Sequence, residues 1–243
     1  MPVMGLGTLF HKDPKAIEHA ISNIGYRNID TATITMNEAD VGKGLTASFA
    51  SGAVQRQDIF LATKLWHNAY GDPETTLRKS LKALNTEYVD LYYLHWPNNF
   101  FSKPQVPMHV LWARLEALVD KGLARGIGVS NFNTQLMSDV LTYARHKPVC
   151  NQICLNPACA QPDHVKFLLD HDIMPVAYSP LGRLGSKMGP KGEDLTQKPL
   201  IKTLAEKYGR SETQIILNWG MSRGYVVIPK ASNLDHQEDN FKA

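Results

Sequence analysis

This sequence has few cysteines, no long apolar run and little net charge, and each absence narrows the classes of protein that it can encode. Cysteine occurs three times in 243 residues. An odd number without CxxC spacing is poor material for a disulfide framework or a zinc site. We interpret Cys150, Cys154 and Cys159 as small buried residues on and after a strand, in a protein of the reducing cytoplasm. The net charge of +3, without a basic run, argues against a nucleic acid partner.

The sequence also lacks the segments by which proteins enter or cross membranes. Its longest apolar runs have the length of strands, far below the roughly 20 residues that span a bilayer. The N-terminal MPVMGLGTLF has no basic region followed by a long apolar stretch, so no signal peptide and no membrane partner are expected. With 43% apolar and 20% charged residues, the composition predicts an ordinary globular protein of the cytoplasm.

No GxGxxG follows the first candidate strand, which argues against an open, doubly wound dinucleotide fold. Instead, short β-rich runs alternate with helical patterns. Helices are expected from about Asn37, over 73–84, around 110–122 and over 134–145. The expected strands are 2–8, 26–30, 59–66, 88–96, 124–132, 150–157, 173–180 and 225–230. Eight apolar strands, each except the last clearly followed by a helix, predict a single α/β domain over 1–243, a closed (β/α)8 TIM barrel. Residues 182–197 form one long polar, glycine-rich connection, typical of a functional or mobile loop.

Polar residues end nearly every apolar run, where a barrel of this kind places its active site. A lone lysine there is usually a surface residue, and a lone histidine is usually a satisfied core residue. Polar groups at seven strand ends are harder to explain by folding alone, because burying them without partners costs free energy. These strand-end residues are Asp30, Lys64, His95, Ser130, Asn131, Gln152, Tyr178, Ser179 and Lys230.

The residue types suggest carbonyl chemistry beside a flat, amide-bearing ring. A buried Asp30–Lys64 pair keeps both groups charged, and its cation lowers the pKa of a neighbouring hydroxyl. His95 adds a hydrogen-bond donor, so the three residues are suited to hold a carbonyl oxygen and to supply a proton. Ser130, Asn131 and Gln152 match the donors and acceptors of a carboxamide, and Tyr178 offers a stacking face; nicotinamide has both features. Alternatively, the acid–base trio is a buried ion pair that only stabilises the barrel.

Several motifs in register resemble the aldo-keto reductase family over essentially the whole chain. They are GLGT (5–8), IDTA (29–32), NEADVG (37–42), TKLW (63–66), DLYYLHWP (90–97), GIGVSNF (126–132), NQ (151–152), AYSPLG (177–182) and VVIPK (226–230). The resemblance implies a (β/α)8 barrel, an extended NADPH without a Rossmann motif, and hydride transfer to small-molecule aldehydes and ketones.

The resemblance also implies roles for individual residues. Asp30, Lys64 and His95 match three members of the family's catalytic tetrad. Trp66 and Trp96 match aromatic walls of the substrate pocket. The implied cofactor-binding residues are Thr8 and Asp30 at the ribose, Ser130, Asn131, Gln152 and Tyr178 at the nicotinamide, Ser179 and Leu181 at the pyrophosphate, and Lys230, Asn233, His236, Asp239 and Asn240 at the adenosine and its 2′-phosphate.

The sequence departs from the family where the fourth tetrad member, a proton-donating tyrosine, is expected. The family pattern DTAxxYxNE reads DTATITMNE here, so Thr35 occupies that position. An aliphatic alcohol is a far weaker acid than a phenol, and general acid catalysis contributes roughly 10²–10⁴-fold. We therefore expect a slow reductase in which His95, or a water held by Thr35, takes the acid role, with activity rising below about pH 6.5. A tyrosine hydroxyl brought beside the trio from elsewhere in the chain would overturn this account.

Other departures affect the pocket, the cofactor and the ends. Leu9 replaces an aromatic pocket wall, and NQICLNP replaces NQVExHP. His236 replaces the arginine that holds the 2′-phosphate, which weakens the preference for NADPH and leaves NADH as an alternative. The family's N-terminal hairpin, most of its eighth helix and its C-terminal tail are absent. We expect an exposed apolar flank between the last and first strands, where a protein partner binds, or else a fragment of a longer protein. The alternative function is a catalytically inactive subunit with a structural or nucleotide-sensing role in a larger assembly.

Overall fold

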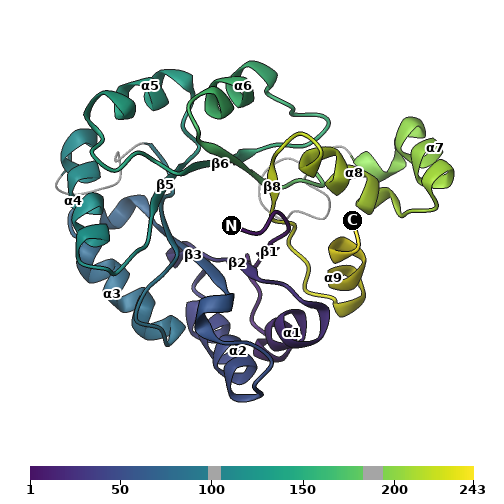
Figure 1. The fold of residues 1–243 in the computed structure, drawn as a ribbon, viewed down its shortest axis with the longest axis horizontal. Coiled ribbons are helices and arrows are strands. Elements are labelled where there is room, and N and C mark those ends of the chain that lie inside the picture. The colour runs from purple at the N-terminus through teal and green to yellow at the C-terminus, as the bar shows by residue number, and fades with distance from the viewer. Residues whose placement is uncertain (98–104, 183–193) are drawn as a thin grey trace.

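Eight parallel strands form one closed barrel in the computed structural model, which describes residues 1–97, 105–182 and 194–243. Each strand pairs with the next in chain order (Figure 1). Parallel bridges Met4–Val227 and Gly7–Lys230 join the first strand to the last, and the Gly5 amide donates to the Val227 carbonyl at 2.8 Å. The strands are β1 Leu6–Gly7, β2 Asn28–Asp30, β3 Phe60–Leu65, β4 Leu91–Leu94, β5 Ile127–Ser130, β6 Cys150–Cys154, β7 Met174–Tyr178 and β8 Val226–Val227. The predicted (β/α)8 architecture is confirmed.

Helices surround this barrel, and the helices that the sequence predicts are present within two residues of the expected ends. They are α1 Pro14–His19, α2 Glu38–Ala50, α3 Pro73–Leu84, α4 Met108–Asp120, α5 Thr134–Tyr143, α6 Pro162–Asp170, α7 Pro199–Tyr208, α8 Glu212–Met221 and α9 Leu234–Phe241. Helix α3 shows why the boundaries are readable: the Asp72 side chain accepts from the Thr75 amide at 3.0 Å, and Pro73 occupies the first turn. Asn85, with φ of 52°, ends the helix in the left-handed conformation.

Five short helical segments complete the described elements. They are the π-helix η1 Ala20–Ile24 and the 3-10 helices η2 Thr33–Thr35, η3 Arg56–Asp58, η4 His67–Ala69 and η5 Leu195–Gln197. Segment η2 joins β2 to α2 and contains the position of the missing tyrosine. Most of the 182–197 connection lies outside the described residues, and η5 is its last part.

The paired strands are shorter than the β-rich runs of the sequence. Six residues, 225–230, are predicted for the last strand, but only Val226–Val227 pair as a ladder. Pro229 has no amide hydrogen to continue the ladder, and its carbonyl instead accepts from the Gly7 amide at 3.0 Å. The residues beyond the ladders lead into the loops at the carboxyl ends of the strands, where the polar residues lie.

The flank between β8 and β1 is covered, so the expectation of an exposed apolar surface there is wrong. Helix α9 follows β8 and lies between α8 and α1 (Figure 1). The Phe241 ring packs on Tyr26 with centroids 4.8 Å apart, and the Tyr26 hydroxyl donates to the Gln237 carbonyl at 2.9 Å. This eight-residue helix shields Tyr26 from solvent. A short amphipathic segment is enough to close the barrel wall at this position.

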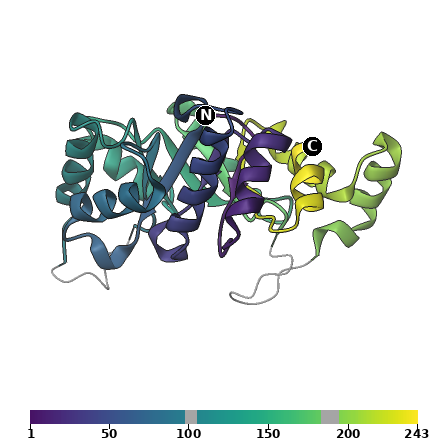
Figure 2. The ribbon, with the colours of Figure 1, turned by 90° about the horizontal axis from the view of Figure 1, so that it is seen from below.

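The outer layer is not uniform around the barrel. Seen from the side in Figure 2, helix α7 stands beyond the rest of the outer layer at the right edge. Within residues 1–97, 105–182 and 194–243, the structure has no helix with the length and hydropathy that a bilayer crossing needs.

Candidate active site

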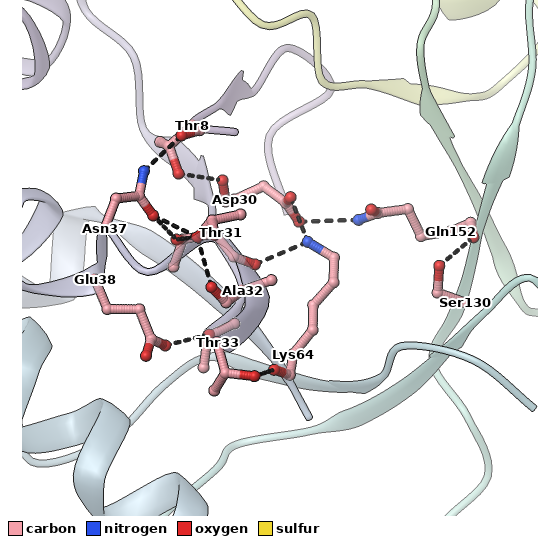
Figure 3. Close-up of polar contacts among 12 residues, drawn as sticks. Thr8, Asp30, Thr31, Ala32, Thr33, Asn37, Glu38, Lys64, Ser130 and Gln152 are labelled. Atoms are coloured by element: carbon pink, nitrogen blue, oxygen red, sulfur yellow. Dashed lines mark hydrogen bonds and ion pairs between the residues drawn. The ribbon is translucent and has the colours of Figure 1, made fainter. Parts of the chain in front are cut away.

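The predicted ion pair between Asp30 and Lys64 lies at the carboxyl ends of two adjacent strands. Asp30 is the last residue of β2 and pairs with Ala62 of β3. Lys64 lies two positions beyond Ala62 on the same strand. The Lys64 ammonium donates to Asp30 Oδ1 and, at 2.8 Å, to the Thr31 carbonyl (Figure 3). Lys64 is 3% exposed and Asp30 is 8% exposed. Burial of either charge alone would be costly, so each stabilises the ionised form of the other.

Gln152 on β6 extends this pair across the barrel. Its Nε2 donates to Asp30 Oδ2 at 2.9 Å, so both carboxylate oxygens of Asp30 have a partner (Figure 3). The Thr8 hydroxyl donates to the Asp30 backbone carbonyl at 2.9 Å. Lys64 on β3 and Gln152 on β6 therefore hold the Asp30 carboxylate, and Thr8 after β1 holds the Asp30 backbone.

His95 follows β4 directly and joins the same end of the barrel. Its backbone amide donates to the Leu65 carbonyl at 3.2 Å, and its ring meets Trp66 edge to face at 4.9 Å between centroids. Burial, with the positive charge of Lys64 and a smaller effect of His67, lowers the pKa of His95 to about 3. The expected rise in activity below pH 6.5 through a protonated His95 is therefore not supported, because the ring is neutral there. Its Nδ1 is buried and has no hydrogen-bond partner among the residues that the structure describes.

Thr35 does not replace the missing tyrosine as a proton donor. It ends η2, and its hydroxyl lies 2.5 Å from the Ala32 carbonyl and also contacts Asn37 Oδ1. The same Oδ1 accepts from the Thr31 hydroxyl at 3.2 Å. Because one hydroxyl has one proton, that proton is committed to oxygen atoms of its own loop. The hypothesis that Thr35 holds a catalytic water is weakened accordingly.

Asn37 is a buried residue whose importance sequence reasoning missed. Its Nδ2 donates to the carbonyls of Thr8 at 2.6 Å and His11 at 2.8 Å, and its Oδ1 accepts from the two threonines of the η2 loop. One side chain thus ties the loop after β1 to the loop after β2. The only signal is the NE pair at the start of α2, formed by Asn37 before the helix and Glu38 within it, and this pair identifies a helix start rather than a clamp.

Tyr93 is a second missed residue, and it bears directly on the proton source. It pairs with Lys64 across β3 and β4, and the Lys64 ammonium lies 5.3 Å from its ring centroid. Tyr93 is 1% exposed, and burial raises its pKa well above the usual range, with further effects of Cys150 and Asp30. Tyr93 lies two residues before His95, on the same inward face, and this alternation was the available signal. A buried tyrosine therefore lies next to Lys64 in the barrel interior, one inward position before His95.

The four residues that match a carboxamide and a stacking ring come together across β5, β6 and β7. The Tyr178 hydroxyl donates to Asn131 Oδ1 at 2.9 Å, and Asn131 Nδ2 donates to the His95 carbonyl at 3.0 Å and to Ser130 Oγ at 3.1 Å. The Ser130 hydroxyl donates to the Gln152 carbonyl at 2.7 Å. A bound carboxamide would exchange some of these hydrogen bonds for its own.

The residues matched to the pyrophosphate and adenosine divide into two groups. Ser179, with φ of 48°, begins a turn closed by the Gly182 amide, and Leu181 packs within this turn against the core. Lys230 and His236 are exposed near the start of α9, where Asn233 caps the helix by accepting from the amides of Asp235 and His236. Asp239 instead accepts from Ser211 at 2.7 Å and Gln214 at 2.9 Å, and Asn240 is buried. Asp239 therefore faces α8, and Asn240 faces the core. Neither contact tests whether these residues bind adenosine, so that role stays a prediction.

The two tryptophans matched to the substrate pocket both follow strands at this end. Trp66 follows β3 and contacts His95, whereas Trp96 is 37% exposed and its carbonyl accepts from the Tyr70 hydroxyl at 2.5 Å. Leu9, Phe10, Ile34 and Met36, from the loops after β1 and β2, are also exposed. The three cysteines are free, with Cys150 and Cys154 on β6 and Cys159 beyond it. No cluster of metal-binding side chains occurs in the part of the chain that the structure describes.

Comparisons with known proteins agree with this geometry. The model of the aldo/keto reductase family matches residues 7–243. An aldose reductase of Encephalitozoon cuniculi is 38% identical over 258 residues, covering 99% of this chain and 84% of that protein. An NADP-dependent D-sorbitol-6-phosphate dehydrogenase of Malus domestica is 33% identical, covering 100% and 85%. The solved structure of a Bombyx mori aldo-keto reductase in complex with NADP superimposes with a TM-score of 0.92 at 33% identity, covering 99% of this chain and 83% of that chain.

These matches extend over the barrel and over every strand end that contributes a polar side chain to the site. The chain belongs to the aldo/keto reductase family.

Proposed function

We propose that this protein reduces aldehydes or ketones with NADPH, at a rate lowered by the absence of a tyrosine at position 35. The observation that supports the proposal is the buried Lys64–Asp30 pair at the mouth of the barrel. It lies beside His95 and beside the residues that match a carboxamide and a stacking ring, which are Ser130, Asn131, Gln152 and Tyr178. The reduced nicotinamide, when bound, supplies a hydride to the carbonyl carbon. The residues of this chain would hold the carbonyl oxygen and stabilise the negative charge that develops on it.

The residues present fit such a cofactor at its nicotinamide end. Asn131 and Gln152 each offer an amide that matches the donors and acceptors of a carboxamide, and Tyr178 presents its ring at the adjacent strand end. The buried Nδ1 of His95 has no hydrogen bond, so this polar end of the barrel is not fully satisfied by the described residues. Ser130, Asn131, Gln152 and Tyr178 would orient the ring against the Lys64–Asp30 pair.

The fit is weaker at the 2′-phosphate end. Lys230 provides one exposed cation there, whereas His236 lacks the bidentate donor geometry of an arginine. The Malus domestica relative is named as NADP-dependent and the Bombyx mori structure contains NADP, which supports NADPH as the preferred cofactor over NADH. We expect that preference to be smaller than a guanidinium would provide, because a single ammonium acts as a point charge.

Two measurements test this function. Binding of NADPH and of NADH is followed by quenching of protein fluorescence, and hydride transfer is followed by deuterium from nicotinamide-labelled NADPH appearing at the alcohol carbon. We expect tighter binding of NADPH and slow, detectable deuterium incorporation with small aldehydes. Absence of label from the alcohol, with NADPH bound, would contradict the catalytic proposal.

The locked hydroxyl of Thr35 favours a second candidate, a catalytically inactive subunit with a structural or nucleotide-sensing role. In that case NADPH would bind without any labelled alcohol. The flank between β8 and β1 gives this alternative no added support, because α9 covers it.

A further inference from the structure

The reaction proposed above requires a proton source that the family's tyrosine does not provide here, and the following inference rests on that proposed function. A carbonyl oxygen becomes negatively charged as its carbon gains a hydride, and it must receive a proton to become an alcohol. Groups with a transferable proton near the Asp30–Lys64 pair include Thr35, His95, Tyr93, Tyr178 and Lys64 itself. The buried Cys150 thiol also acts on this pair, but burial raises its pKa to about 12.

Four of these five groups are poor candidates for structural reasons. The Thr35 hydroxyl is committed to Ala32 and Asn37, and an aliphatic alcohol is a far weaker acid than a phenol. His95 is neutral at ordinary pH, because burial and Lys64 lower its pKa to about 3. The Tyr178 hydroxyl donates its proton to Asn131 at 2.9 Å.

Tyr93 is excluded by its position. It lies within β4, one inward position before His95, and is 1% exposed. Its side chain is enclosed in the barrel interior at the residue of β4 that pairs with Lys64, and the Lys64 ammonium lies 5.3 Å from its ring centroid. Burial also raises its pKa well above the range of an ordinary phenol.

Lys64 differs from these groups, because one N–H of its ammonium is not used in a hydrogen bond to the described residues. Asp30 Oδ1 and the Thr31 carbonyl take two of its three N–H groups. The third N–H has no oxygen or nitrogen partner among residues 1–97, 105–182 and 194–243. Lys64 also lies one residue before the carboxyl end of β3, at the end of the barrel where Asp30, His95 and Gln152 gather.

We propose that Lys64 is itself the proton donor of this enzyme, delivering its third N–H to the carbonyl oxygen directly or through one water. The carbonyl carbon gains a hydride from the reduced nicotinamide, which is thereby oxidised, and an N–H bond of Lys64 breaks as an O–H bond forms. The neutral amine then regains a proton from solvent. In water an ammonium and a phenol have similar acidity, about 10.4 and 10, so the exchange of donors is chemically reasonable.

The surroundings of Lys64 determine how readily its proton leaves. Asp30 holds the ammonium by a direct ion pair, and the Tyr93 ring adds a weaker attraction. The titratable groups that face or act on Lys64 are Asp30 on β2, Glu38 on α2, Tyr93 on β4, His95 after β4 and Cys150 on β6. Negative charge on the nascent alkoxide would offset the pull of Asp30 and favour proton release.

Lys64→Arg is the first test, because arginine keeps the positive charge and the pairing with Asp30 but does not release a proton at ordinary pH. If Lys64 only stabilises charge, this variant should keep most of its activity. If Lys64 donates the proton, kcat/KM should fall by about 10²-fold while NADPH affinity is unchanged. Retention of the wild-type rate by Lys64→Arg would overturn the proposal.

A second variant, Lys64→Ala, covers the case in which arginine does not fit the site. Small primary amines added to this variant should restore reduction, and the rescue should increase with the acidity of the ammonium ion used. Absence of rescue in a folded variant that still binds NADPH would contradict a proton-donor role.

A readout without cofactor completes the test. In the free protein, the lysine side-chain NMR signal that disappears in Lys64→Arg should titrate with the same midpoint as the alkaline limb of kcat/KM in the wild type, because kcat/KM reports the groups of the free enzyme. Midpoints that differ would overturn the assignment. These results are distinguishable from failure of the proposed function itself, in which the wild-type protein transfers no deuterium from labelled NADPH to any carbonyl compound.

Discussion

Two regions of the active-site end are built in opposite ways. In the strand region, formed by Asp30, Lys64 and Gln152, charged and polar groups from β2, β3 and β6 converge on one carboxylate. In the loop region, formed by Thr35 and Asn37 on η2 and before α2, polar groups bond one another and the local backbone. In the strand region, the Lys64 ammonium keeps one N–H without a partner among the described residues, whereas in the loop region the Thr35 hydroxyl bonds oxygen atoms of its own loop. The lysine that we propose as the acid catalyst is therefore present, while a threonine held by its own loop stands where the family has a phenol.

The largest expected effect comes from breaking the strand region. Lys64→Met leaves the Asp30 carboxylate buried without its charge partner, which should lower the free energy of unfolding by about 3–5 kcal/mol. Urea denaturation measures this loss. Lys166→Met is the matched control, because its exposed pair with Asp170 at 2.6 Å should contribute almost nothing to stability. Equal effects of the two substitutions would contradict the view that the buried pair organises the site.

The loop region should be broken by removing its clamp. Asn37 is buried and makes hydrogen bonds to two backbone carbonyls and two hydroxyls, so Asn37→Ala should cost about 2–3 kcal/mol in the free energy of unfolding. Amide exchange should increase at the loops after β1 and β2 and remain unchanged in α3. Substitution of the exposed Asn23 by alanine provides the control. A loss confined to distant helices would disprove the clamp.

The pH dependence of the free energy of unfolding tests whether His95 is buried and neutral beside the strand region. Its pKa is lowered to about 3 in the folded protein, so the unfolded chain binds a proton near pH 6.5 that the folded protein does not. This contribution to stability is full above pH 6.5 and is lost as the pH falls toward 3. Between pH 7 and 5 the loss should be about 2 kcal/mol. Unfolding measured over this range should show a shallower slope in His95→Gln, and identical slopes would refute a neutral, buried His95.

The smallest expected effect is at the hydroxyl of Thr35. Thr35→Val should lower the free energy of unfolding by about 1 kcal/mol through the lost loop hydrogen bond. It should leave the rate of carbonyl reduction unchanged, because this hydroxyl is not the proton source. Steady-state kinetics with NADPH and an aldehyde check this point. A tenfold slower Thr35→Val enzyme would show instead that the threonine takes part in the chemistry.

The elements that the sequence predicts well are those with local signals. Asp72 and Pro73 mark the start of α3, and the apolar runs before Asp30 and Gln152 mark strands whose ends meet at one edge of the barrel. The Asp30–Lys64 pair is predictable because adjacent parallel strands bring their carboxyl ends together. The positions of the strand-end residues could consequently be predicted from the sequence, whereas their roles stay predictions.

The features that were missed depend on three-dimensional surroundings. The pKa of His95 is lowered by burial and by Lys64, which no local motif encodes. Tyr93 reads as an ordinary core residue of β4 until its ring is seen beside the ammonium. Asn37 reads as a helix start until its amide is seen to join two loops. The cover of the β8–β1 flank by α9 was missed because eight residues at the end of a sequence carry little periodicity.

The most direct test of the account is the rate of NADPH-dependent aldehyde reduction by Thr35→Tyr compared with the wild type. Restoring a phenol beside an intact Lys64–Asp30 pair should raise kcat by about 10²-fold, at the lower end of what general acid catalysis contributes, because Lys64 already supplies a proton. An unchanged or lower kcat, in a variant that folds and binds NADPH as the wild type does, would show that more than the tyrosine is missing from this site.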